Sequence, residues 1–65
     1  MDYDRAIKDS DEAIRLEPNS SGAFYNRGLA WGQKTDYDRA IKDFSEAIRI
    51  DPNNADAFHN RGLAW

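Results

Sequence analysis

The chain has 65 residues, no cysteine and a formal net charge of −3, with 40% apolar and 32% charged residues. A chain of this length holds at most one small domain, and the lack of cysteine excludes a disulfide framework and a thiolate metal site. The scattered Lys and Arg residues argue against a nucleic-acid partner, whose phosphates require a clustered basic face. No apolar run approaches the ~20 residues of a membrane span, so we expect a soluble cytoplasmic protein with no membrane partner, or a piece of something larger.

A first helix is predicted over residues 2–17. Small or apolar side chains recur there at the spacing of one helix face: Tyr3, Ala6, Ile7, Ser10, Ala13 and Ile14. Such a stripe is typical of an amphipathic helix that packs on a neighbour. Asp2 can cap the first turn with its carboxylate. Pro18 ends the helix, because the residue before a proline is pushed out of helical geometry.

Charged residues of opposite sign stand four apart on the same helix. The pairs are Asp4/Lys8, Arg5/Asp9 and Asp11/Arg15. They are predicted to form ion pairs on its solvent side, each contributing roughly 0.2–0.5 kcal/mol.

A second helix is predicted over residues 21–34, with Ser20 or Ser21 as its N-cap. Four of its residues share one face: Phe24, Arg27, Gly28 and Trp31. A glycine inside a helix costs about 0.5–1 kcal/mol relative to alanine. Gly28 therefore indicates the close approach of a neighbouring helix.

The second half of the chain repeats the first with a period of 34 residues. Residues 2–31 align with residues 36–65, and 22 of these 30 positions are identical. A third helix is therefore predicted over residues 36–51 and a fourth over residues 55–65, with Pro52 turning the chain and Asn54 as the last N-cap. Similarity this high indicates recent duplication or a designed near-consensus array.

The second and third helices carry a spaced motif: Phe24-x-x-Arg27-Gly28-x-x-Trp31, then Ala40-x-x-x-Phe44, then Pro52. Together with the 34-residue period, this motif resembles the tetratricopeptide repeat (TPR) family. The resemblance implies an all-α fold, a fragment of an α-solenoid built from antiparallel helix-turn-helix units. In the family's terms the helix order is B, A, B, A, and only residues 21–52 form a complete unit. That order is expected to leave apolar faces bare at both ends.

The turn between the second and third helices departs from the family pattern, which usually places Gly just before the Asp that starts helix B. Thr35 occupies that place, and a β-branched residue resists the left-handed conformation that ends such a helix. Either the second helix ends near Gly32, or residues 33–35 stay helical. A continuous helix would open the hairpin and favour exchange of helices between chains. The ordinary turn is the preferred alternative.

Arg27 and Arg61 stand where the family pattern has Leu. A buried arginine requires an acidic partner, because an unpaired charge inside a protein costs several kcal/mol. Asp9 and Asp43, one on each B helix, are the expected partners. The alternative is an aliphatic stem packed in the groove with its guanidinium in water.

The resemblance also implies that one face of the A helices lines a concave groove for an extended peptide or a partner helix. The predicted site residues are Tyr25, Asn26, Leu29 and Gln33 on the second helix, and Asp56, His59, Asn60 and Leu63 on the fourth. Asn26 and Asn60 match a groove position where many family members carry Asn, whose carboxamide can both donate to and accept from a peptide backbone. Alternatively, these two residues are inherited consensus residues without a ligand. The Lys and Arg clamp of chaperone-binding members is incomplete here and is not assigned.

No catalytic residue, metal site or cofactor is predicted. His59 is the single histidine, with no second histidine, cysteine or paired carboxylates in register. Acidic residues at the helix starts, such as Asp2 and Asp4, are explained by capping. Trp31 and Trp65 lie at packing-stripe spacing, which favours core residues over a ligand-stacking pair.

The predicted function is a protein–protein interaction module whose A-helix face binds a protein or peptide. The alternative is a structural self-assembling unit without a dedicated ligand, because a chain that starts with B and ends with A has complementary ends. Ser10 occupies the place of Phe44 and would suit a solvated N-terminal end. A homodimer is therefore preferred over an open fibre.

Overall fold

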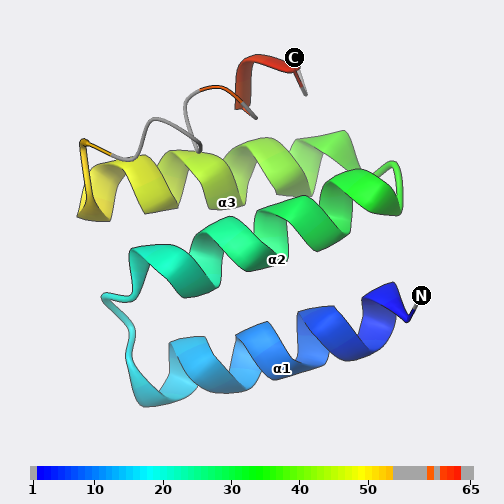
Figure 1. Cartoon of the computed structure of the whole chain (residues 1–65), viewed down its shortest axis with the longest axis horizontal. Helices are drawn as coiled ribbons and strands as arrows, with labels where there is room; N and C mark the ends of the chain where they lie inside the picture. The colour runs from blue at the N-terminus through cyan, green and yellow to red at the C-terminus, as the bar shows by residue number, and fades with distance from the viewer. Residues whose placement is uncertain (1, 54–58, 60, 64–65) are drawn as a thin grey trace.

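The computed structural model describes residues 2–53, 59 and 61–63. Within them three helices follow one another: α1 (Tyr3–Leu16), α2 (Ser21–Gln33) and α3 (Tyr37–Ile50) (Figure 1). His59 and residues 61–63 also have helical backbone, and the rest of the predicted fourth helix lies outside the described residues, as does its N-cap Asn54. The described part of the chain contains helices and no strand, so the all-α prediction is confirmed.

Each of the three helices begins at a capping side chain. Side-chain oxygens of Asp2, Ser20 and Asp36 accept hydrogen bonds from the backbone N–H three residues further on, at 3.0, 3.2 and 3.3 Å. These bonds satisfy N–H groups that have no partner inside the helix. Of the two serines available, Ser20 is therefore the cap of α2. The Ser21 hydroxyl instead donates to the carbonyl of Ala47 at 3.1 Å, which ties the start of α2 to the end of α3.

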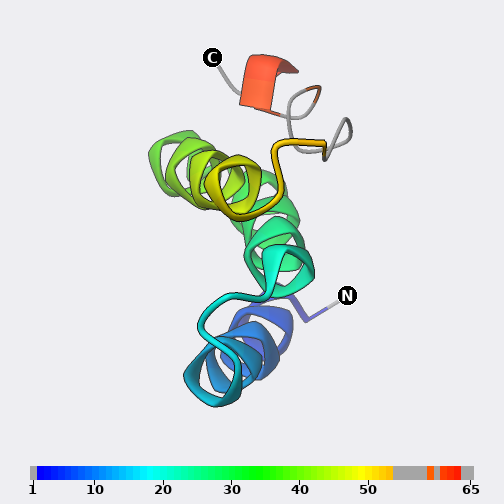
Figure 2. The ribbon, with the colours of Figure 1, turned by 90° about the vertical axis from the view of Figure 1, so that its left-hand side faces the viewer.

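The middle helix of the fold is α2, which contacts α1 on one side and α3 on the other (Figures 1 and 2). Neighbouring helices run antiparallel, and the helical residues 61–63 lie beyond α3, far from α1. The buried apolar residues are Ile7, Ala23, Ala30, Ala40, Phe44 and Ala47. Four of these six are alanines, so the helices pack closely through small side chains.

At Gly28 the backbone of α2 packs directly against a side chain of α3. A Cβ atom built on Gly28 would lie 2.6 Å from Cε1 and 2.7 Å from Cδ1 of Phe44. Favourable carbon–carbon contacts lie at about 3.5–4.0 Å, so α2 can tolerate no side chain here without displacing the ring. The structure thus explains the mid-helix glycine and identifies Phe44 as the residue it accommodates.

The turn after α2 closes the hairpin with a threonine in left-handed conformation. Thr35 has a φ of 65°, and no other described non-glycine residue has a positive φ. Its N–H donates to the carbonyl of Gly32 at 3.0 Å, and the N–H of Asp36 donates to that of Trp31 at 2.9 Å. These two bonds form a Schellman motif with Thr35 at the position that usually holds glycine. The helix ends at Gln33. The alternative of a continuous helix is therefore wrong. Exchange of helices between chains was expected only from that alternative and is no longer supported.

The face that α1 turns toward α2 carries Ile7 and Ser10, both buried, with Tyr3 and Ile14 half-buried beside them. Ser10 is only 9% exposed. The expectation that Ser10 lies at a solvated end is therefore wrong, because α1 presents this position to α2. The argument that Ser10 favours a discrete dimer over an open series of copies no longer holds.

Candidate functional site

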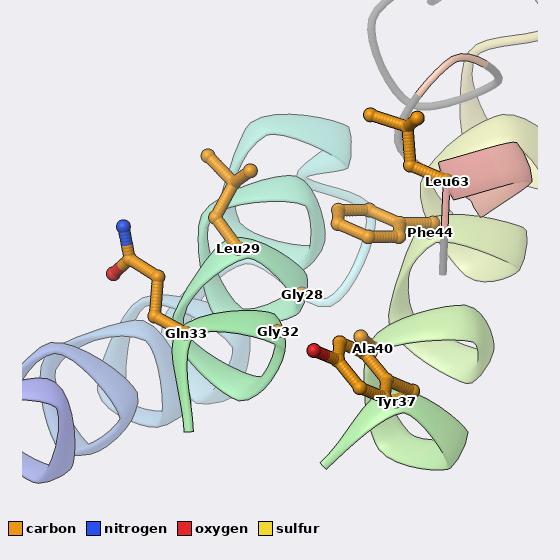
Figure 3. A pocket seen from close by; sticks show the side chains of 8 residues that line it. All are labelled: Gly28, Leu29, Gly32, Gln33, Tyr37, Ala40, Phe44 and Leu63. Carbon is orange, nitrogen blue, oxygen red and sulfur yellow. The ribbon is translucent and has the colours of Figure 1, made fainter. Parts of the chain in front are cut away.

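An open apolar pocket of about 200 Å³ lies between α2 and α3 (Figure 3). We call it the groove pocket. Its lining residues are Gly28, Leu29, Gly32, Gln33, Tyr37, Ala40, Phe44 and Leu63. The first four come from α2, the next three from α3, and Leu63 from the helical residues beyond α3. The pocket therefore depends on segments far apart in the sequence.

Two glycines one turn apart form the α2 side of the groove pocket. The ring of Phe44 fills the space beside Gly28, whereas a Cβ atom on Gly32 would meet no atom within 4 Å. The α2 surface is therefore open next to Gly32. Tyr37 and Leu63 border this opening and are large apolar residues with exposures of 50% and 71%. Exposed apolar side chains around a concave surface are typical of a site that buries an apolar group of a ligand.

The structure brings three of the predicted site residues to the groove pocket. Leu29 is half-buried and Gln33 is exposed, and both project from the α2 wall (Figure 3). Leu63 lies across the pocket from them. An apolar ligand group would thus meet Leu29 and Leu63, and the carboxamide of Gln33 could donate to or accept from a ligand backbone at the rim.

Three other predicted site residues, Tyr25, Asn26 and His59, are not among the described residues that line the groove pocket. Tyr25 is half-buried, with its ring 5.9 Å from that of Phe44 at a tilt of 49°, which is a packing contact between α2 and α3. Asn26 and His59 are exposed. Asp56 and Asn60 lie outside the described residues.

Five pocket residues were missed by reasoning from the sequence: Gly28, Gly32, Tyr37, Ala40 and Phe44. All of them except Gly32 were interpreted as packing residues of a helix pair. A usable signal was present, because two glycines spaced four apart remove side chains from one strip of a helix. Whether such a strip is covered or open depends on the neighbouring helix, so the sequence pattern alone does not locate the pocket.

A half-buried arginine pairs with a buried carboxylate on a different side of α2. The Arg27 Nε and Nη2 atoms donate to Oδ2 and Oδ1 of Asp43, each at 2.8 Å, and Nη1 donates to Oδ1 of Asp11 at 2.7 Å. The hydrogen bonds with Asp43 raise the pKa of Arg27 above its ordinary value. Asp43 is 5% exposed, so this two-pronged contact keeps a buried carboxylate paired.

Asp43 is thus the expected partner of Arg27, and the alternative of a solvated guanidinium is wrong. The second partner is Asp11 rather than Asp9. The Arg27 side chain therefore links all three helices.

Other ion pairs also differ from the predicted spacing of four residues. Asp4 pairs with Lys34 across α1 and α2. Arg15 takes Glu12 as its partner, three residues away, instead of Asp11. The Glu12 carboxylate accepts hydrogen bonds from Arg15, which lowers the pKa of Glu12. Two of the predicted pairs, Asp4/Lys8 and Asp11/Arg15, are therefore replaced.

Trp31 is only half-buried, which corrects the expectation of a core residue. The Arg39 guanidinium lies 4.7 Å from its ring centroid, and the Lys34 ammonium lies 5.7 Å from it. Cations at these distances are attracted to the negative face of the ring. Trp31 thus joins α2 to the start of α3 at the protein surface.

Among the residues that the structure describes, no group of three or more His, Asp or Glu side chains could hold a metal ion. None of the described helices is long and apolar enough to cross a membrane.

Comparison with models of known protein families finds a match to this helical chain. The family model of the TPR repeat matches residues 33–65, just over half of the chain. A search of curated proteins finds no match. TPR repeats typically act as non-catalytic modules for protein interaction or as scaffolds.

Proposed function

Since this chain belongs to the TPR repeat family, we propose that it is an interaction module that binds a peptide or helix of a protein partner through the groove pocket. One observation carries the proposal. The groove pocket is open and apolar, and it lies on the α2 face that holds Leu29 and Gln33. An apolar side chain of the partner enters beside Gly32, where α2 presents no side chain.

The size of the pocket limits what it contributes. Burying a side chain such as Leu or Phe contributes roughly 1.5–3 kcal/mol. Association itself costs at least about 4 kcal/mol in lost freedom of motion. The pocket therefore anchors a partner, and the rest of the affinity comes from contacts along the groove.

Exposed carboxamides on α2 supply such contacts. Asn26, Leu29 and Gln33 lie at i, i+3 and i+7, so they share one side of the helix. A partner backbone that runs along this side of α2 meets the carboxamides of Asn26 and Gln33. Each carboxamide can both donate and accept hydrogen bonds. We propose the same role for Asn60, which repeats Asn26 in the fourth segment.

The test uses a peptide selected against the chain itself. Displayed libraries of helical and of extended peptides are selected on the immobilised protein, and one enriched peptide is labelled for fluorescence anisotropy. Gly32→Leu fills the pocket, and the control Lys8→Leu places a leucine on α1, away from the groove pocket. A Cβ atom at Gly32 meets nothing within 4 Å, and Lys8 is exposed, so neither position packs in the core.

We expect Gly32→Leu to raise the Kd at least about tenfold, which corresponds to 1.4 kcal/mol of lost burial. Lys8→Leu should leave the Kd within about twofold of wild type. Equal Kd values for wild type and Gly32→Leu would rule out the groove pocket as the anchor. Unchanged binding after replacing both Asn26 and Asn60 by Ala would refute the role of the carboxamides.

A further inference from the structure

The outward side of α1 differs from the equivalent side of α3, although the two helices have nearly the same sequence. Ala6, Asp9 and Ala13 are all exposed. Their equivalents 34 residues later are Ala40, Asp43 and Ala47, which are 0%, 5% and 0% exposed. Leu16 continues the row at i, i+3, i+7 and i+10 and is 65% exposed. We call Ala6, Asp9, Ala13 and Leu16 the outer face of α1.

On α3 the equivalent row is covered by α2. Gly28 packs on Phe44 next to this row, Arg27 holds Asp43 in a two-pronged ion pair, and Ser21 bonds the carbonyl of Ala47. The row buries its two alanines and its aspartate because a helix with the sequence of α2 lies on it. The outer face of α1 has the same pattern of residues, and among the described helices it has no such cover.

The chain contains a second segment of the α2 type. Residues 60–65 repeat residues 26–31 without a change, so that Arg61 and Gly62 correspond to Arg27 and Gly28. The helical residues 61–63 lie beyond α3, with α2 and α3 between them and α1 (Figures 1 and 2). Within one molecule this segment cannot reach the outer face of α1.

We propose that the outer face of α1 binds the helical segment around residues 61–63 of a second copy of this chain. Arg61 of one copy takes Asp9 of the other, with the geometry that Arg27 and Asp43 show inside the molecule. The two surfaces differ from each other, so the contact is heterologous and each copy keeps one free surface of each kind. Copies therefore add head to tail rather than closing as a symmetric dimer.

One difference between the repeats weakens the contact. Phe44 fills the space beside Gly28 in α3, whereas α1 has the much smaller Ser10 at this position, turned toward α2. Gly62 of the second copy would therefore meet fewer atoms than Gly28 does. Association should be reversible and rise with protein concentration.

The experiment reverses the charges of Asp9 and Arg61 in two separate variants and then mixes the two variants. Sedimentation velocity is recorded for wild type, Asp9→Arg and Arg61→Asp over a wide concentration range, with circular dichroism to show that each variant keeps its helices. Asp38→Arg on α3 is the matched control, because Asp38 is also exposed and the charge change is the same. When two copies of the same charge-reversed variant meet, positions 9 and 61 carry like charges. In an equimolar mixture of the two variants, these positions carry opposite charges again.

We expect the weight-average sedimentation coefficient of wild type to rise with concentration. Each of Asp9→Arg and Arg61→Asp alone should lower the association constant at least about tenfold, because facing like charges oppose docking. Their mixture should associate again, and Asp38→Arg should match wild type. The proposal is overturned by a wild type that stays monomeric at all concentrations, by an Asp9→Arg chain that associates like wild type, or by a mixture that stays monomeric. It does not depend on the groove pocket, so Gly32→Leu should leave self-association unchanged.

Discussion

Replacing Thr35 by glycine should make the protein more stable. Thr35 ends α2 in a left-handed conformation, with a φ of 65°. For an L-residue this conformation costs roughly 1–2 kcal/mol, because its Cβ atom lies too close to the following carbonyl oxygen. β-branched residues adopt the left-handed conformation even more rarely than other L-residues do. The two hydrogen bonds of the Schellman motif hold Thr35 there despite this cost.

The expected gain follows from three contributions. Because Thr35 is β-branched, its strain lies at the upper end of this range, so glycine removes about 2 kcal/mol. The substitution also costs about 0.5–1 kcal/mol of stability, because glycine loses more conformational freedom on folding than other residues do. The hydrogen bond from the Thr35 hydroxyl to the Lys34 carbonyl is exposed and competes with water, so its loss costs about 0.5 kcal/mol at most. The net change is about +0.5 to +1 kcal/mol in the free energy of unfolding, which raises the Tm by roughly 2–8 °C.

Thermal and urea unfolding, followed by far-UV circular dichroism and tryptophan fluorescence, measure this change. The urea midpoint should rise while the slope m stays constant, because the folded structure is unchanged. Thr35→Asn should lie between wild type and Thr35→Gly, since Asn tolerates the left-handed region better than other side chains. Gln33→Gly is the control, because a glycine at the last residue of α2 should destabilise the protein. A Thr35→Gly protein that unfolds at or below the wild-type midpoint would refute the reasoning.

Two other substitutions test the packing of α2. Gly28→Ala gains helix propensity of about 1 kcal/mol, yet it should destabilise the protein by up to about 2 kcal/mol net. Its Cβ atom would overlap the Phe44 ring, and overpacking costs about 1–3 kcal/mol; Gly22→Ala, with open space around it, should be neutral or stabilising in the same urea unfolding assay. Arg27→Met should lower the free energy of unfolding by about 3 kcal/mol, since it leaves the Asp43 carboxylate buried without its main partner. Adding Asp43→Leu should recover most of that loss, and a double variant as unstable as Arg27→Met would show that the ion pair is not the cause.

Much of the fold could be predicted because its determinants are local. The period of 34 residues, the apolar stripe of α1, the prolines and the caps at Asp2, Ser20 and Asp36 all act within a few residues along the chain. Among the described helices, α1, α2 and α3 therefore begin and end within about a residue of their predicted bounds, and differences of this size are ordinary.

Less of the candidate site could be predicted. Helical spacing placed Leu29 and Gln33 on one side of α2, and the repeat placed Leu63 in the equivalent segment. The pocket itself exists because the Phe44 ring fills the space at Gly28 but leaves Gly32 open. That difference depends on how far α3 lies from each turn of α2, which spacing along one helix does not contain.

The sequence by itself determined that this protein is a set of amphipathic helices in a 34-residue repeat, because helix period, caps and breakers are properties of neighbouring residues. Only the tertiary structure decided the full set of charges that meet. Arg27 binds the expected Asp43, but its second partner is Asp11 in place of Asp9. Two nearly identical helices, α1 and α3, likewise have opposite exposures on their equivalent faces. Exposure depends on which helix lies opposite, and identical sequences in different surroundings therefore have different burial.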